Sequence, residues 1–250
     1  MSPGKSPDAI DVGRGATTLV ACVGDSITRG SVSADYVTLL NHRLTSAGFE
    51  VVNEGTNGNL AWNVLQRLDA IIARQPDVVT LLIGTNDVNA TLDEKSQRSY
   101  HRSQGIPVNA SLAWYRENVA AILDRLASQT NARVIVLDIP MLGEDLSSQW
   151  NRRIDAHNTA LREICAERTV ECLPLHDRLA ALIPAGHQPP PYTGDRMVIV
   201  TSMLGHTILR RSWDDISRRN GMTVLTDHIH LNDKAAAVVA GLVEEALTQG

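Results

Sequence analysis

Residues 18–30 read TLVACVGDSITRG, an apolar and β-branched run followed by a polar turn with a glycine on each side. The run Thr18–Val23 is continuous rather than alternating, which is typical of a parallel strand buried on both faces. The turn places Ser26 between this strand and a predicted helix. The stretch therefore predicts a strand, turn and helix in succession, the repeating unit of an α/β fold.

Further apolar runs of the same kind lie at residues 51–52, 78–83, 134–139 and 170–173. Helical patterns separate them, as in the i, i+3, i+4, i+7 spacing of apolar side chains within residues 119–126. Asn232 or Asp233 is expected to cap the last helix. The alternation predicts a three-layer α/β/α sandwich around a five-stranded parallel sheet, with ligands bound beyond the carboxyl ends of the strands.

The chain is expected to form a single domain, residues 17–250, after a flexible lead-in of residues 1–16. Segments at about 88–112 and 184–226 break the alternation and are predicted to be insertions. The apolar share of 43% suffices for one substantial core. Pro, Gly and Asp near the N-terminus stand where a signal peptide would be apolar. We therefore expect a cytoplasmic protein, unless a secretion signal has been trimmed.

Composition narrows the choice of partner. The longest apolar stretch, residues 235–243, is far below the roughly 18 residues of a spanning helix, so no stable membrane insertion is expected. The net charge is -5, and acidic and basic residues are interleaved along the chain, so no basic surface for binding nucleic acid is expected. Cys22, Cys165 and Cys172 lack metal-ligand spacing and argue against a zinc site or a disulfide framework. A small-molecule substrate is expected, and no motif indicates an oligomeric state.

Ser26 is a candidate nucleophile, because a serine hydroxyl beside a base, with backbone N–H groups to bind an oxyanion, can attack a carbonyl. The alternative is that Ser26 only caps a helix. The loops after the second and third strands, residues 53–58 and 84–87, read NEGTNG and GTND and should share the same edge of the sheet. Their glycine and asparagine can donate hydrogen bonds, and Asp25 and Asn57 are expected to contact substrate. Ordinary turn formation is the alternative.

Residues 226–232 read TDHIHLN, just before the last predicted helix. A carboxylate three residues before a histidine can accept the proton of one ring nitrogen and leave the other free as a base, so Asp227 and His230 are the expected pair. His228 would point elsewhere in an extended segment, at the surface or behind the substrate contacts. The two histidines could also be metal ligands, but no third ligand joins them at a recognisable spacing, so no metal is expected.

Together these motifs resemble one family, the SGNH hydrolases, also called the GDSL esterases and lipases. Residues 24–27, Gly-Asp-Ser-Ile, resemble its first block, with Ile in place of the usual Leu. Gly58 falls at the glycine of the second block, residues 84–87 resemble the third, and residues 227–230 resemble the last. The four motifs stand in the family's order and span residues 24–232.

The resemblance implies a flavodoxin-like fold and a serine ester hydrolase of the carboxylesterase or lipase type, which forms an acyl-enzyme on a small or lipid-like ester. It implies that Ser26 is the nucleophile and an oxyanion donor, that Gly58 and Asn86 are further oxyanion donors, and that His230 and Asp227 complete a triad. It implies no cofactor.

Other functions remain open at this point. An acyl thioesterase or a lysophospholipase would use the same residues. A non-catalytic flavodoxin-like protein that binds flavin or nucleotide is the alternative from another class. Against it, neither G-x-G-x-x-G nor a Gly-Lys-Ser/Thr loop follows the first strand, and a phosphate site would leave Asp227 and His230 unexplained.

Residues 197–209 form a strongly apolar stretch within the second insertion. Its length predicts a helix, although residues 198–201 are β-branched. Because the insertion directly precedes the Asp227 loop, we expect a lid or an acyl-pocket wall, with Met203 and Leu204 in contact with substrate. The alternative is an extra helix that packs permanently on the domain.

Overall fold

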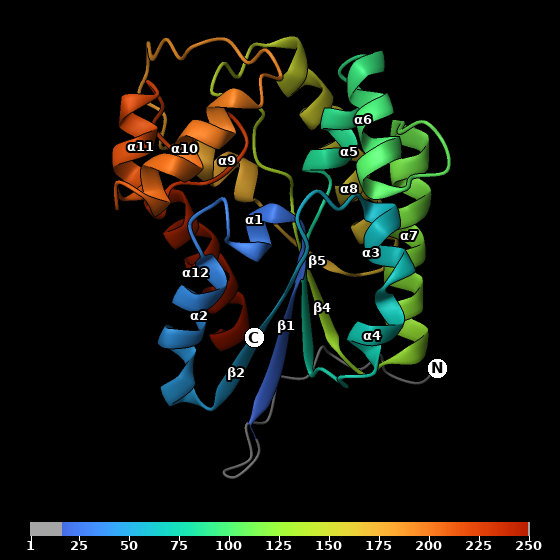
Figure 1. Ribbon diagram of the computed structural model, residues 1–250. Coiled ribbons are helices and arrows are strands. Elements are labelled where there is room, and N and C mark those ends of the chain that lie inside the picture. The colour runs from blue at the N-terminus through green and yellow to red at the C-terminus, as the bar shows by residue number, and fades with distance from the viewer. Residues whose placement is uncertain (1–16, 250) are drawn as a thin grey trace.

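The computed structural model describes residues 17–249, so the predicted lead-in at residues 1–16 lies outside the described part of the chain. The centre of the molecule is a parallel sheet in the order β2-β1-β3-β4-β5, the flavodoxin-like order (Figure 1). The strands are β1 (Thr18–Gly24), β2 (Phe49–Gly55), β3 (Val78–Leu82), β4 (Arg133–Leu137) and β5 (Glu171–Leu173). The predicted five-stranded parallel sheet is confirmed.

Strand β2 is longer than residues 51–52, the run that predicts it. It lies at the edge of the sheet and pairs with β1. Glu50 is exposed and residues 52–54 are half-buried. An edge strand with polar, partly exposed side chains lacks the continuous apolar run of a central strand, which explains the short prediction.

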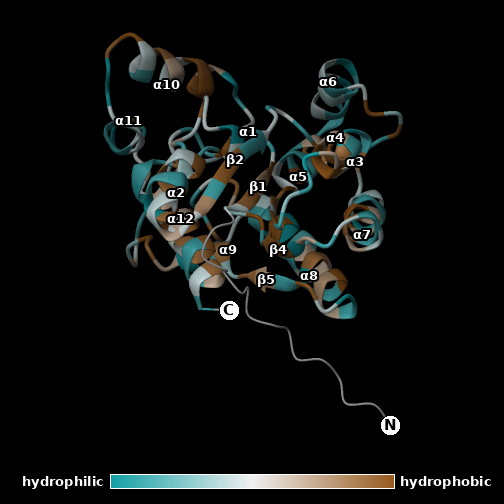
Figure 2. Cartoon of the chain, turned by 90° about the horizontal axis from the view of Figure 1, so that it is seen from below, coloured by the Kyte–Doolittle hydropathy of each residue, from teal (hydrophilic) through white to brown (hydrophobic). Residues whose placement is uncertain are grey.

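Helices cover both faces of the sheet and give the three predicted layers (Figure 2). One face carries α2 (Tyr36–Leu44), α9 (Leu175–Ala180) and α12 (Asp233–Thr248), and the other carries α3 (Ala61–Gln66), α4 (Leu68–Ile72), α7 (Leu112–Gln129) and α8 (Gln149–Glu167). Successive residues of β1 point to opposite faces, so Val20 packs in the first core and Ala21 in the second. Asn232 caps α12 as predicted, by accepting from the N–H of Ala235.

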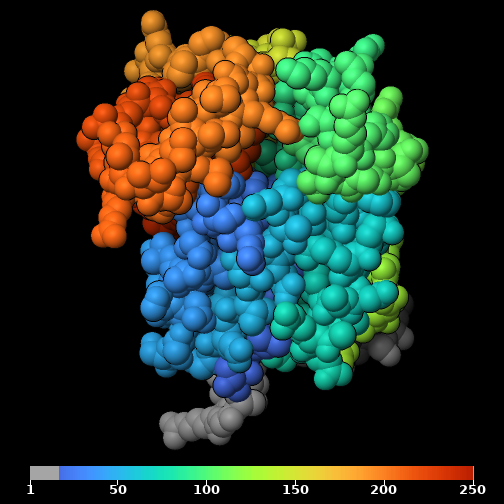
Figure 3. Space-filling view, in the orientation of Figure 1, coloured from blue at the N-terminus to red at the C-terminus, as the bar shows by residue number. Residues whose placement is uncertain are grey.

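Short helices and both irregular segments gather at the carboxyl edge of the sheet. Helix α1 (Ser26–Arg29) follows β1, and α5 (Thr85–Ala90) follows β3, whereas the 3-10 helix η1 (Thr45–Ala47) leads into β2. The first segment contains α6 (Glu94–Gln104), and the second contains α10 (Met197–Thr207) and α11 (Trp213–Arg219). In the space-filling view the two segments form separate lobes at one end of the molecule (Figure 3).

Helix α10 is the predicted helix within residues 197–209. Its buried residues are Ser202 and Gly205, whereas Leu204 is 48% exposed. Other large apolar side chains in and just after the helix are also exposed: Met197, Val200, Ile208 and Leu209. No helix in the described chain combines the length and the apolar character that a membrane crossing requires.

Candidate active site

Strand β1 delivers Ser26 to the carboxyl edge of the sheet through a tight turn. Asp25 caps α1, because its Oδ1 accepts from the N–H of Ile27 at 2.9 Å. Ser26 is therefore the first residue of the helix, and the alternative that Ser26 is its cap is wrong. A Cβ at Gly24 would lie 2.5 Å from the carbonyl oxygen of Leu82, so this turn requires glycine.

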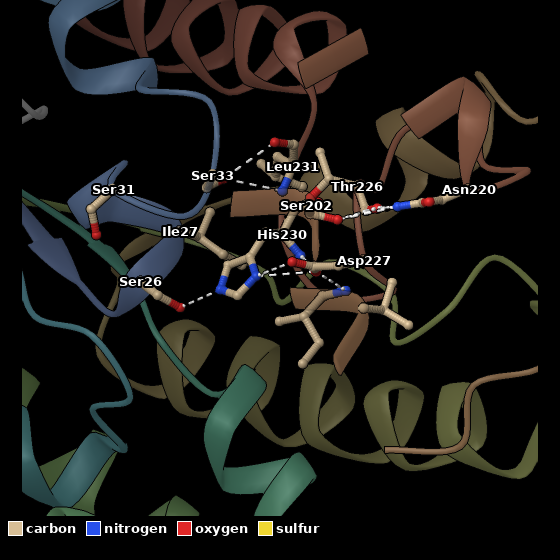
Figure 4. Close-up of polar contacts among 12 residues, drawn as sticks. Ser26, Ile27, Ser31, Ser33, Ser202, Asn220, Thr226, Asp227, His230 and Leu231 are labelled. Atoms are coloured by element: carbon tan, nitrogen blue, oxygen red, sulfur yellow. Dashed lines mark hydrogen bonds and ion pairs between the residues drawn. The ribbon is translucent and has the colours of Figure 1, made fainter. Parts of the chain in front are cut away.

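His230 lies between Ser26 and Asp227 (Figure 4). Its Nε2 is 2.9 Å from Ser26 Oγ, and its Nδ1 is 2.9 Å from Asp227 Oδ2. Because an ionised carboxylate only accepts, Nδ1 carries the ring proton and Nε2 is left to accept the proton of the serine hydroxyl. The exposed fractions are 7% for Ser26, 5% for His230 and 1% for Asp227. The structure thus brings together, in the interior, the three side chains that the motifs single out.

Asp227 also fixes the backbone of the loop that carries it. Its Oδ1 accepts from the N–H of Ile229 at 3.1 Å and from the N–H of His230 at 2.9 Å. The N–H of Thr226 donates to the carbonyl oxygen of His230 at 2.7 Å and closes the loop. One carboxylate therefore orients both the imidazole ring and the main chain on which the ring is mounted.

Glu144 supports the chain just before this loop. Its buried carboxylate accepts from the backbone N–H groups of residues 223–225 at 2.7 to 2.9 Å. His187 Nε2 lies 3.0 Å from the same carboxylate. The motifs do not reveal Glu144, because its backbone partners are 79 to 81 residues away and main-chain groups leave no signature in a sequence.

His228 is buried, which excludes the surface and leaves the other predicted place, behind the substrate contacts. Its backbone has a φ of 75°, in the left-handed region, and is not extended as expected. This turn brings Asp227 and His230 to the same side of the loop, and the ring of His228 packs on Tyr192 with the centroids 5.6 Å apart. Within residues 17–249, no three His, Cys, Asp or Glu side chains lie close enough together to hold a metal ion.

Opposite charges set the titration of the His230 and Asp227 pair. Burial lowers the pKa of His230, but the negative charge of Asp227 and its hydrogen bond outweigh burial and raise the pKa above the ordinary 6.5. Burial raises the pKa of Asp227, but the charge of His230 and the hydrogen bonds to the carboxylate outweigh it, so the pKa falls below 3.8. Asp227 is therefore ionised wherever the enzyme is folded at neutral pH.

The pKa values of Asp25 and Asp87 are raised, whereas that of Asp227 is lowered. Burial raises the pKa of Asp25 to about 6, against the opposing hydrogen bond from Ile27. Burial likewise raises the pKa of Asp87 to about 8, although the N–H of Ala61 donates to its carboxyl group. Asp25 follows β1 and Asp87 lies in the first turn of α5; both carboxyl groups are buried at the sheet edge, which disfavours their charged forms.

The loops after β1, β2 and β3 meet at one edge, because these strands end level in the sheet register. Asn86 Nδ2 donates to Asp25 Oδ2 at 3.2 Å and to the carbonyl oxygen of Asn59 at 3.0 Å. Gly58 has a φ of 76°, and a Cβ there would lie 2.4 Å from Gln104 Nε2. The left-handed backbone conformation favours glycine at this position, whereas the Gln104 side chain could move aside.

Tyr100 of α6 also reaches this edge, where its hydroxyl donates to Asn86 Oδ1 at 2.6 Å. The motifs do not identify it, because the segment 88–112 carries none. The available signal is that Tyr100 is the one large aromatic residue in an otherwise polar helix, and it is the buried residue of α6.

The side chains predicted to contact substrate lie in different settings. Asp25 is 1% exposed and bonds to Asn86. Asn57 is exposed and exchanges hydrogen bonds with Ser31 at 3.1 and 3.2 Å. On α10, Met203 is half-buried and Leu204 is exposed.

The chain matches the sequence profile of the GDSL-like lipase/acylhydrolase family over residues 22–238, a range that includes Ser26 and His230. The chain belongs to this family. Membership confirms the resemblance that the motifs indicate and identifies this GDSL-like protein as a hydrolase of carboxylic esters. No curated protein gives a match to the chain.

Solved structures of other hydrolases share the fold of this GDSL-like chain and confirm the predicted fold class. A catalytic mutant of an acetylxylan esterase from Geobacillus stearothermophilus has a TM-score of 0.68 at 16% identity and covers 94% of this chain and 95% of its own. The acetyl xylan esterase AlAXEase has a TM-score of 0.63 at 20% identity, and the match covers 92% of this chain and 99% of the esterase. A lipase/acylhydrolase from Enterococcus faecalis has a TM-score of 0.62 at 19% identity, and the match covers 92% of this chain and 95% of the lipase/acylhydrolase.

Proposed function

We propose that the chain is a serine esterase in which Ser26 is the nucleophile, His230 the general base and Asp227 its partner. The observation that carries the proposal is the continuous series of hydrogen bonds from Ser26 Oγ through both ring nitrogens of His230 to Asp227. Such a series activates a hydroxyl that is otherwise a weak nucleophile. Catalytic mutants of the Geobacillus enzyme support the proposal, since they replace a serine, a histidine and an aspartate three positions before that histidine.

The reaction has two halves. In the first, Ser26 Oγ attacks the carbonyl carbon of the ester while His230 Nε2 takes the hydroxyl proton. The tetrahedral intermediate then expels the alcohol, which receives that proton from His230, and the acyl group stays on Ser26. In the second, His230 takes a proton from water, whose oxygen attacks the acyl carbon and releases the acid. Ionised Asp227 stabilises the imidazolium in both halves.

The oxyanion is assigned to the N–H of Ser26, the N–H of Gly58 and the amide of Asn86, which would exchange its longer hydrogen bond, the one to Asp25 at 3.2 Å, for a bond to the oxyanion. Ser26 opens α1, so its N–H is among those that the helix leaves without an internal partner. The other two donors follow β2 and β3, and these strands end level with β1, the strand that leads to Ser26. In other enzymes the loss of one such donor lowers kcat by about 10²–10³.

A short acyl group, with acetyl as the first candidate, is the proposed substrate class. In support, two of the similar structures are acetyl xylan esterases, and Ser26 and His230 expose only 7% and 5% of their surface. A long acyl chain is the second candidate, favoured by the exposed apolar side chains of α10, such as Leu204. A thioester or a lysophospholipid would engage the same catalytic residues, so the acyl donor is decided by assay.

The test is a panel of p-nitrophenyl esters from acetate to palmitate, run beside an acyl-CoA and a lysophospholipid. We expect the highest kcat/KM on acetate and its abolition in Ser26→Ala. If Ser26→Ala keeps more than about a tenth of the wild-type rate in a clean preparation, Ser26 is not the nucleophile. A preference for the acyl-CoA or the lysophospholipid would replace the esterase assignment with that activity.

A further inference from the structure

The carboxamide of Asn86 is held from both of its ends. Its Nδ2 faces the Asp25 carboxylate at 3.2 Å and the carbonyl oxygen of Asn59 at 3.0 Å. Its Oδ1 faces the hydroxyl of Tyr100 at 2.6 Å. A backbone carbonyl oxygen can only accept, so the amide nitrogen must face Asn59 and the amide oxygen must face Tyr100. Tyr100 is consequently a donor to Asn86.

This assignment sets the direction of the hydrogen bonds beyond Tyr100. Because Tyr100 gives its single proton to Asn86, its oxygen accepts from Asn89 Nδ2, at 3.2 Å. Asn89 Oδ1 then faces Tyr192, whose hydroxyl donates to it at 2.8 Å. The four side chains form a one-way series of donors that runs from Tyr192 through Asn89 and Tyr100 to Asn86.

The series joins both irregular segments to the site. Tyr100 lies on α6, in the segment 88–112, and is 5% exposed. Tyr192 lies in the segment 184–226, and its ring also packs on His228 in the loop of the triad. The segments that carry no family motif therefore supply the polar contact at the amide oxygen of Asn86 and the side chains behind it.

We propose that Tyr100 is a positioning residue, which keeps the amide nitrogen of Asn86 turned toward the loops that follow β1 and β2. Those loops carry the other two oxyanion donors, Ser26 and Gly58. A hydrogen bond to the amide oxygen also polarises the amide and strengthens its N–H groups as donors. The inference rests on the proposed function, because it assigns Tyr100 a role through the oxyanion donor Asn86.

The variant Tyr100→Phe removes the hydroxyl and keeps the ring. We expect kcat on p-nitrophenyl acetate to fall about tenfold with KM unchanged, because an oxyanion donor acts mainly in the transition state. The inhibition constant of phenylboronic acid, which forms a tetrahedral adduct with a serine hydroxyl, should rise by about the same factor. Wild-type kcat and wild-type boronate affinity in Tyr100→Phe would overturn the proposal.

The matched control is Tyr36→Phe. Tyr36 is also a buried tyrosine, and its hydroxyl lies 3.1 Å from Thr28 Oγ1, outside the series. Loss of this hydroxyl should lower the melting temperature and leave kcat within about twofold of wild type. An equal loss of kcat in Tyr36→Phe and Tyr100→Phe would mean that any missing buried hydroxyl slows the enzyme, and the proposal would fail.

The direction of the series has its own test, Asn89→Asp. A carboxylate accepts from both tyrosines and draws the proton of Tyr100 away from Asn86, so kcat should fall at least as far as in Tyr100→Phe. Tyr192→Phe keeps the ring on His228 and should lower kcat in the same direction by a smaller factor. Wild-type kcat in folded Asn89→Asp would exclude the one-way series.

Ser26→Ala separates this inference from the proposed function. If Ser26→Ala retains hydrolysis, the proposed function fails and the positioning role fails with it. If Ser26→Ala is inactive while Tyr100→Phe has wild-type kcat, the serine esterase stands and only the positioning role is lost.

Discussion

His230 Nε2 lies 2.9 Å from Ser26 Oγ, although 204 residues separate them in the chain. The backbone explains the contact. Leu231 donates its N–H to Ser33 Oγ at 3.0 Å, and its carbonyl oxygen accepts from the N–H of Ala34 at 3.0 Å, so the triad loop is bonded to the segment that follows α1 (Figure 4). The distance between His230 and Ser26, the proposed base and nucleophile, is therefore held by main-chain contacts as well as by the side chains.

Asp227→Asn tests the role of the carboxylate in the triad. The asparagine oxygen can still accept from the backbone N–H groups of Ile229 and His230, so the fold should persist. Its amide nitrogen would instead face His230 Nδ1 and favour the wrong tautomer, and kcat on p-nitrophenyl acetate should fall by about 10⁴. The check is kcat together with the melting temperature. A loss below about tenfold would show that Asp227 does not orient the base.

The pH profile reports on His230. Because the base must be neutral to accept a proton, kcat/KM should rise with pH and level off above the pKa of His230. Asp227 holds that pKa above 6.5, so the midpoint should lie above 6.5 in the wild type and move down in Asp227→Asn. The measurement is kcat/KM between pH 5 and 9, run in buffers of equal ionic strength. A profile that falls across this range would contradict a neutral histidine base.

The fold and the proposed triad can be predicted from the sequence because their signals are local. Central strands buried on both faces need continuous apolar runs, and Ser26, Asp227 and His230 stand in short motifs at the ends of elements. Edge strand β2 is partly exposed and carries polar side chains, so its apolar run is short and predicts only part of the strand.

The contacts that support the site are not local and leave weaker signals. Glu144 binds backbone N–H groups 79 to 81 residues away, and Tyr100 reaches Asn86 from a polar helix. His228 adopts a left-handed conformation that an extended reading of residues 226–232 does not anticipate. These features depend on how distant segments pack, which no spacing within one segment encodes.

Asp87 should make stability depend on pH. Its pKa is raised by burial from 3.8 to about 8, so the folded chain holds a proton that the unfolded chain releases. The stability that this proton contributes is fully present below about pH 4 and is lost as the pH rises through about 8. In Asp87→Asn, which is neutral throughout, the urea midpoint should fall less between pH 5 and 8 than in the wild type. Asp155→Asn, on the exposed face of α8, is the control, and a slope equal to wild type in Asp87→Asn would contradict the argument.

Glu144 should contribute strongly to the free energy of unfolding. Glu144→Ala leaves the N–H groups of residues 223–225 without their acceptor in a buried setting, at a cost of about 3 kcal/mol or more. Glu144→Gln keeps one oxygen, which accepts from the same residues, and should cost about 1 kcal/mol. Urea unfolding at pH 7 measures both, with His187→Ala as a control for the side-chain partner. A loss below about 1 kcal/mol in Glu144→Ala would show that water replaces the carboxylate.

Two neighbouring residues of α10 decide whether this helix is a wall for acyl chains or only a structural element. Leu204 is 48% exposed, whereas Gly205 is buried, and a Cβ there would lie 3.6 Å from the side chain of Ile216. The helix is also tied to the triad loop, since Ser202 Oγ donates to the carbonyl oxygen of Thr226. The Leu204 side chain is thus accessible to an apolar ligand, whereas Gly205 packs against α11.

Leu204→Ser should leave the free energy of unfolding within about 0.5 kcal/mol of wild type, because the side chain it replaces is half in water. If α10 lines the path of the acyl chain, the same variant should lower kcat/KM on p-nitrophenyl octanoate by about threefold or more while acetate is unaffected, since only the longer chain reaches Leu204. Gly205→Leu should do the reverse and destabilise the fold by about 1–3 kcal/mol through overpacking against Ile216. An unchanged octanoate-to-acetate ratio in a stable Leu204→Ser would assign α10 to structure alone.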